Sequence, residues 1–176
     1  MLEDRNLRDE LNKFAKFVIQ QARSRLTKSG KRDTSSLYNS LGSRIEKTAN
    51  DVKLSFLMND YGDFVDKGVR GKESSAKAPN SPYRFGSGTG AKGGLRKGIS
   101  SWVERKRIQF RDKKGRFISY KRTSFLISRS IYRTGIRPSL FFTKPFEQAF
   151  AKLPDDLIRA YSVGIEKQLN VTIKEK

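Results

Sequence analysis

A regular stripe of apolar residues near the N-terminus constrains the fold more than any other feature of the chain. Successive members lie four, three, four, four and four positions apart: Leu7, Leu11, Phe14, Val18, Ala22 and Leu26. This spacing places all of them on one face of an α-helix, with charged residues on the other faces. The pattern predicts an amphipathic helix over about residues 4–27 that ends near Ser29 and Gly30.

The rest of the chain alternates between strand and helix patterns. Apolar and polar residues alternate in Val52–Met58, which predicts a β-hairpin with Ser43–Glu46. Helical spacing returns at 95–106 and at 122–133, where we expect the second helix to bury Phe125, Ser128, Ile131 and Tyr132. A C-terminal helix, or a helix pair divided at Pro154, should follow Pro145. The predicted fold class is therefore α+β, with a long N-terminal helix, a small antiparallel sheet, a basic helical insert and this C-terminal part.

Composition favours one folded domain without a catalytic centre. Leu, Ile, Val and Phe make up 44 of the 176 residues, above the level of roughly 20% below which charged chains stay disordered. The chain contains neither cysteine nor histidine, which excludes disulfides, thiolate nucleophiles, Ser-His-Asp triads and the usual zinc sites. We expect a single domain over 1–176, no enzymatic activity, no cofactor and no bound metal.

Positive charge is concentrated in one stretch of the sequence. The whole chain carries a formal charge of +20, and residues 92–137 hold 15 basic side chains against only Glu104 and Asp112. We interpret 92–137 as a basic insert, preceded by a glycine-rich segment without periodicity that predicts a flexible loop at 71–94. Charge of this density predicts an acidic protein partner or nucleic acid.

Aromatic residues interleave with the basic ones in the insert, as they do in proteins that bind a nucleic-acid backbone. No helix-turn-helix, RRM or KH signature accompanies them. Nucleic-acid contact and docking to an acidic protein surface therefore both remain open. The candidate contacts for either partner are Arg105, Lys106, Arg107, Arg111, Lys113, Lys114 and Arg116.

Two further patterns resemble ligand sites but lack the context that such sites need. Asp60, Asp63 and Asp66 have the charge for a magnesium ion, yet no other acidic cluster lies nearby to complete a site. Partnership with Lys67 and Arg70 is the simpler interpretation. The string Gly88–Gly93 matches the G-x-G-x-x-G pattern of dinucleotide-binding folds, but it neither follows a buried strand nor lies in a βαβ unit. We do not predict a nucleotide site there.

Three segments, taken in order, resemble motifs of the tail-completion and head–tail joining proteins of tailed bacteriophages, the minor neck-protein family. They are Asp33–Leu41, with Ser35 where the family has glycine; Tyr61–Gly68, with Gly62 in place of alanine; and Arg137–Phe142, which leads to Pro145 and Phe146. The basic helices at Leu95–Lys106 and Phe125–Gly135 resemble an insert found in some members. The residues that match the motifs are Asp33, Thr34, Leu37, Ser40, Tyr61, Phe64, Val65, Asp66, Gly68, Arg137, Pro138 and Phe142.

The resemblance implies a structural virion protein that forms a ring in the neck, completes the tail and joins it to the head. Expected partners are further copies of the chain (six is typical of the family), stopper, adaptor or portal-side proteins, and tail terminator or tail tube proteins. The genome would pass through the lumen, with possible contact to packaged DNA. A soluble chain that assembles in the host cytoplasm, has no membrane partner and ends in the virion is therefore expected. The lack of a long apolar run fits that localisation.

A ring requires one patch on each subunit to meet a different patch on the next. Exposed aromatic or apolar residues in the matching segments are the natural candidates. We list Phe64, Val65, Leu140, Phe141 and Phe142 as candidate interface residues. Packing within the subunit is the alternative role for each of them.

Overall fold

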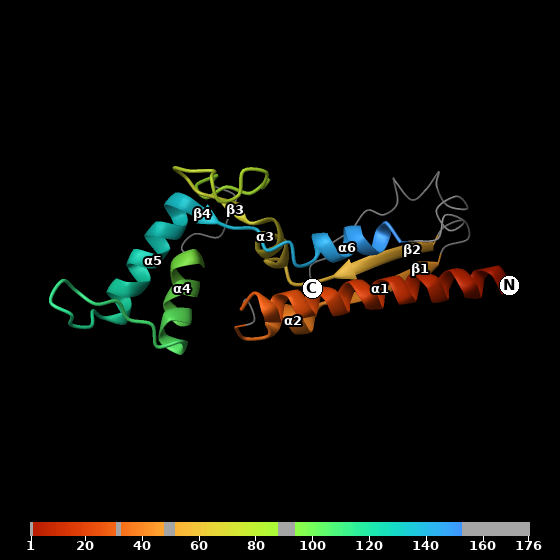
Figure 1. Cartoon of the computed structure of the whole chain (residues 1–176), viewed down its shortest axis with the longest axis horizontal. Coiled ribbons are helices and arrows are strands. Elements are labelled where there is room, and N and C mark those ends of the chain that lie inside the picture. The colour runs from red at the N-terminus through yellow and green to blue at the C-terminus, as the bar shows by residue number, and fades with distance from the viewer. Residues whose placement is uncertain (1, 31–32, 48–51, 88–93, 153–176) are drawn as a thin grey trace. The chain divides into compact units, whose positions relative to one another are not determined.

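The computed structural model describes residues 2–30, 33–47, 52–87 and 94–152. The fold is α+β, as predicted, with about half of the described residues in helices (Figure 1). The chain separates into two compact units. Unit 1 comprises Met1–Asp66 together with Ser139–Lys176, and unit 2 comprises Lys67–Pro138. The sequence predicts a single domain with an insert at 92–137, whereas the inserted unit begins at Lys67.

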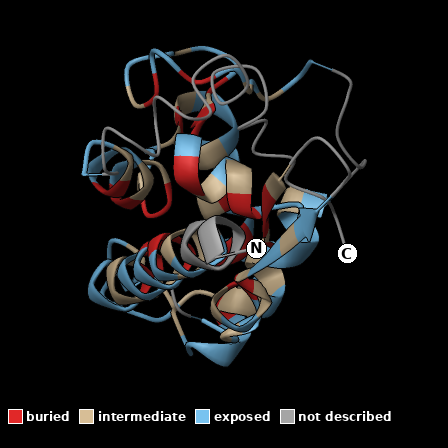
Figure 2. Ribbon diagram, turned by 90° about the vertical axis from the view of Figure 1, so that its right-hand side faces the viewer, coloured by how far each residue is buried: buried red, intermediate tan, exposed pale blue. Residues whose placement is uncertain are grey.

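Unit 1 is built on the predicted N-terminal helix, α1, which spans Leu2–Lys28. One face of α1 is buried in the core, as predicted. The buried residues of the predicted stripe are Phe14, Val18, Ala22 and Leu26. Figure 2 shows that the helices of the chain carry both buried and exposed residues, as amphipathic helices do. The short helix α2, Ser36–Ser40, follows and buries Leu37.

The predicted hairpin pairs β1, Gly42–Lys47, with β2, Val52–Leu57, in antiparallel register. Gly42 lies opposite Leu57 and Lys47 opposite Val52. Leu54 and Phe56, on alternate positions of β2, are buried, and Met58 continues this face just beyond the strand. Because side chains alternate along a strand, one face of the hairpin faces the core of unit 1.

Aromatic side chains fill the core between α1, the hairpin and α6, Thr143–Phe150. The ring of Phe56 is in edge contact with Phe14, Phe142 and Phe146, at centroid distances of 6.1, 5.1 and 6.0 Å. Edge-to-face packing at such distances is the preferred arrangement of aromatic pairs. Pro145 lies in the first turn of α6, as predicted. The helix pair predicted around Pro154 falls outside the described residues.

Unit 2 joins a very short sheet to a helix pair. Strand β3, Val69–Arg70, pairs antiparallel with β4, Gly135–Ile136, and helices α4, Gly94–Arg105, and α5, Tyr120–Thr134, pack side by side (Figure 1). Glycine is required where the two strands meet, because a Cβ added to Gly135 would lie 2.4 Å from the carbonyl oxygen of Val69.

The buried face of α5 differs from the predicted one. Phe125 is 42% exposed and Tyr132 is 36% exposed, whereas Thr123 and Ser124 are buried beside the correctly predicted Ser128. The prediction assumed that the larger apolar residues face inward. The buried face of α5 instead carries small hydroxyl residues whose polar groups are paired. The Ser124 and Ser128 hydroxyls donate to carbonyls of the same helix, and the Thr123 hydroxyl accepts from the Phe110 amide.

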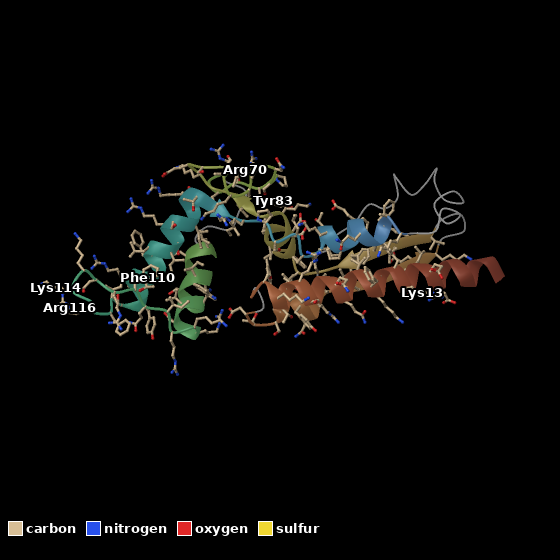
Figure 3. The ribbon with its side chains drawn as sticks, viewed as in Figure 1. Lys13, Arg70, Tyr83, Phe110, Lys114 and Arg116 are labelled. Atoms are coloured by element: carbon tan, nitrogen blue, oxygen red, sulfur yellow. The ribbon has the colours of Figure 1, made fainter. Side chains whose placement is uncertain are left out.

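Residues 71–87, predicted as part of a flexible loop, are attached to the rest of unit 2 by hydrogen bonds. The amides of Lys72 and Glu73 donate to carbonyl oxygens of Tyr132 and Arg133 at the end of α5, and the buried Ser81 hydroxyl donates to the Gly68 carbonyl at 2.7 Å. Arg70 accepts from Phe85 and donates to Tyr83 through its backbone (Figure 3). Residues 88–93, which include the G-x-G-x-x-G string, lie outside the described residues.

Candidate functional site

Two segments that match the family motifs meet within unit 1. The backbone carbonyls of Val65 and Asp66, at the end of α3 (Gly62–Lys67), accept hydrogen bonds from the amides of Ser139 and Leu140. The Ser139 hydroxyl also donates to the Val65 carbonyl at 2.6 Å. Segments more than seventy positions apart are thus joined by a continuous set of main-chain bonds.

The Asp66 carboxylate is the centre of this junction. It is only 2% exposed, and its Oδ1 accepts from the amides of Phe142 and Thr143, at 2.8 and 3.2 Å. The Thr143 hydroxyl donates to Oδ2. These are the free N–H groups at the start of α6, where a negative charge is also favoured by the helix dipole. The Asp66 carboxylate therefore bonds to Phe142 and Thr143, the N-cap residue and the first residue of α6.

The first motif segment is joined to the second by Asn59, which sequence reasoning missed. The backbone N–H of Asn59 donates to the Ser40 hydroxyl at 3.0 Å. The side-chain amide of Asn59 donates to the Ser36 hydroxyl at 2.9 Å. Gly62 packs close by, since an added Cβ would lie 2.5 Å from the Met58 sulfur. The only sequence signal for this contact was the position of Asn59 just ahead of the second motif.

The first motif also contains an unusual backbone conformation. Ser35, where the family has glycine, adopts φ of +60° directly before α2. The left-handed turn that glycine favours is therefore formed here by serine. Asp33 and Thr34 are exposed, and Ser35 is the N-cap residue of α2.

Burial separates the candidate interface residues into two groups. Phe141 is fully buried and Phe142 is 6% exposed, and both belong to the core of unit 1, so packing within the subunit is the role that the structure shows for them. Val65 is half-buried against that core. Phe64 is 43% exposed, while Leu140 is half-buried. A single sequence cannot distinguish a core aromatic run from a surface one, since both consist of the same residues.

The motif residues Arg137 and Pro138 are the last two residues of unit 2, and the chain re-enters unit 1 at Ser139. Arg137 and Pro138 are exposed, and Pro138 closely approaches Gly68. A Cβ on Gly68 would lie 2.5 Å from the Ile136 carbonyl oxygen and 2.7 Å from the Pro138 nitrogen, at a φ of +72°. Only glycine fits both this backbone angle and this space.

All seven predicted basic contacts are exposed and lie in one segment, from the end of α4 to the turn that precedes α5. In Figure 3 the turn that carries Lys114 and Arg116 projects beyond the ends of α4 and α5. A single antiparallel bridge pairs Arg111 with Phe117, and a tight turn at Gly115 closes it. Unit 2 carries 20 Lys and Arg residues against 3 Asp and Glu residues, which is +17 of the total charge.

Asp112, the only acidic residue of this turn, is occupied by bonds within it. Its Oδ1 accepts from the amides of Lys114 and Arg116, both at 2.9 Å, and its Oδ2 accepts from the Arg116 side chain at 3.0 Å. The Arg116 amide, followed by the Arg116 side chain and the Lys114 amide, lowers the pKa of Asp112 against a weaker opposing effect of desolvation. The turn is therefore built around an ionised carboxylate.

Arginine side chains stack on the exposed aromatic rings of unit 2. The Arg111 guanidinium lies 4.1 Å from the Phe117 ring centroid and also donates to the Gly115 carbonyl at 2.9 Å. Arg96 of α4 lies 5.4 Å from the ring of Phe125 on α5. Stacking engages the face of a guanidinium and leaves its edge for other hydrogen bonds.

No group of three or more acidic residues able to hold a metal ion occurs within the described ranges, and Asp60, Asp63 and Asp66 do not form one. Among the described helices, none is long and apolar enough to cross a membrane. Comparison of the chain with protein-family models, curated proteins and solved structures found no match. Function must therefore be inferred from the two features above, the motif junction in unit 1 and the basic surface of unit 2.

Proposed function

We propose that the chain is a structural protein of a tailed-phage virion that forms a ring in the neck and has no enzymatic role. The observation that carries the proposal is the meeting of the resembling segments. Asn59 joins the first segment to the start of the second, and Asp66 joins the second to the third. Short strings that match by chance have no reason to hydrogen-bond to one another across the fold.

In this proposal the junction is the framework of the subunit, and exposed residues beside it form the ring contacts. Among the five candidate interface residues, Phe64 is the one whose side chain is exposed. The expected partners are other copies of the chain, portal-side stopper or adaptor proteins, and tail terminator or tail tube proteins. Assembly would take place in the host cytoplasm, and the protein would end in the virion.

The proposal is tested on particles of the phage that encodes the chain. Mass spectrometry of purified virions should detect the protein at a few copies per particle, and electron microscopy should place a ring of it between head and tail. A Phe64→Glu variant should leave the subunit folded and the heads without tails, with Asp60→Lys as a charged control on the exposed side of the same segment. Absence of the chain from complete virions would refute the proposal.

A second candidate function, nucleic-acid binding by unit 2, is favoured by its charge of +17 in 72 residues. Binding of the full chain to duplex DNA should weaken steeply with salt, by about 0.9 logarithmic units per tenfold change in salt for each phosphate neutralised. The two candidates are compatible, since a neck protein also meets DNA. The two tests are independent, because one examines virions and the other the purified chain.

A further inference from the structure

We propose that the turn Arg111–Phe117 of unit 2 is a pre-organised site for the phosphate backbone of duplex DNA. The inference rests on the proposed nucleic-acid function of unit 2 and narrows it to one site and one ligand chemistry. The turn presents four basic side chains: Arg111, Lys113, Lys114 and Arg116. All four are exposed, and the single carboxylate among them is occupied by its own hydrogen bonds.

The order of the turn distinguishes it from a merely charged surface. Asp112 fixes the main chain through the amides of Lys114 and Arg116, and Gly115 closes the turn with a φ of +77°. Arg111 is held by the Phe117 ring and by the Gly115 carbonyl. Less conformational entropy is then lost when a phosphate binds, because the main chain of the turn and the Arg111 and Arg116 side chains are already in place.

The composition of the surface favours phosphate over carboxylate partners. From Arg105 to Arg137 the chain has eight arginines and four lysines against one acidic residue, Asp112. The planar guanidinium fork forms bidentate bonds with phosphate oxygens, and DNA supplies such groups at a closer linear spacing than the carboxylates of most protein surfaces. The same charge density leaves few acidic residues to repel a polyanion.

The placement of the aromatic residues indicates contact with the DNA backbone rather than with its bases. Single-strand binders offer aromatic faces on which bases stack. In unit 2 the rings of Phe117 and Phe125 each have a guanidinium over one face, from Arg111 and Arg96. These rings therefore position arginines, and the surface is suited to a duplex whose bases stay paired.

The test compares two double variants that remove equal charge. Lys113→Gln with Lys114→Gln alters the turn without removing a side-chain bond of Asp112, and Lys16→Gln with Lys28→Gln removes two exposed lysines from α1 of unit 1. Anisotropy of a short labelled duplex is measured with the full chain between about 50 and about 200 mM KCl. Thermal melting of each variant checks that it is folded.

The turn variant should bind DNA about tenfold more weakly than the parent chain at the low-salt end, with a salt slope smaller by about 1.8, since two phosphate contacts are lost. The α1 variant should keep both values. Equal losses in the two variants, or no loss in the turn variant, would overturn the site while leaving DNA binding by the chain intact. Failure of the parent chain to bind DNA at low salt would overturn the nucleic-acid function itself.

Two further arms test the ligand and the pre-organisation. Single-stranded DNA that binds much more tightly than duplex, or polyglutamate that displaces duplex as efficiently as unlabelled DNA does, would contradict the assignment to duplex backbone. Phe117→Leu leaves the charge unchanged and removes the ring beneath Arg111. We expect it to weaken binding two- to threefold with melting temperature unchanged, and an unaltered affinity would show that charge alone accounts for binding.

Discussion

Units 1 and 2 are stabilised in different ways. Unit 1 places thirteen buried apolar residues in one cluster, including Phe14, Phe56 and Phe142, and carries a net charge of only +3. Within its described residues unit 2 buries Val69, Ala78 and Val103 and depends on hydroxyl groups and main-chain bonds, while carrying +17. Since like charges destabilise a compact state, unit 2 has less apolar burial to offset a larger repulsion.

The difference fits two different roles within the proposed neck protein. A large aromatic core and a buried carboxylate suit a unit that must keep its shape, as the framework of a ring subunit would. A small core under a dense positive charge suits a unit whose surface meets a polyanion, because binding supplies stability that the core lacks.

The largest effect is expected from removing the central ring of unit 1. Phe56→Ala should lower the free energy of unfolding by about 3–5 kcal/mol, because three aromatic neighbours lose their partner and a cavity remains. Phe125→Ala in unit 2 is the matched control and should cost less than about 1 kcal/mol, since that ring is already 42% exposed. Urea unfolding measures both. Equal losses would contradict a core confined to unit 1.

The next largest effect concerns the buried carboxylate. Asp66→Ala should destabilise unit 1 by about 3 kcal/mol, because the amides of Phe142 and Thr143 lose their acceptor at the start of α6. Asp60→Ala, on an exposed residue of the same segment, should change stability by less than about 0.5 kcal/mol. Thermal unfolding of the two variants compares them. A mild effect of Asp66→Ala would mean that water replaces the carboxylate and that the junction is not structural.

Sequence patterns predicted the helices and strands that follow from a local repeat of apolar residues, and they missed contacts between residues far apart in the chain. The helix α1 and the strand β2 follow from patterns among neighbours in the chain, and both elements were confirmed, but the alternation of burial in β2 was not, since Ser55 is buried between Leu54 and Phe56. The bond of Asp66 to Thr143 spans 77 positions, and no local pattern contains it. The buried face of α5 was wrong because unit 2 buries Thr123 and Ser124 and exposes Phe125, against the usual rule that larger apolar residues lie inside.

A smaller effect, of opposite sign, is expected at Ser35. Its φ of +60° is unfavourable for a residue with a Cβ, so Ser35→Gly should raise the free energy of unfolding of unit 1 by about 0.5–1 kcal/mol. Asn39→Gly, within α2, should lower it, because glycine weakens a helix. Chemical unfolding resolves the two signs. A loss of stability in Ser35→Gly would show that the serine side chain contributes more than its backbone angle costs.

The smallest effect is a local one in the turn of unit 2. Hydrogen bonds from Arg116 and Lys114 lower the pKa of Asp112, so their contribution is present above its ordinary pKa of about 4 and is lost as the pH falls through the lower folded value. The NMR amide signals of Lys114 and Arg116 should therefore stay constant from pH 8 to pH 5 and shift together below about pH 4, and Asp112→Asn should abolish that shift. Amides of α1 in unit 1 serve as the internal reference. A titration between pH 5 and pH 8 would contradict an ionised Asp112 at the centre of the turn, and with it the pre-organisation on which the phosphate site depends.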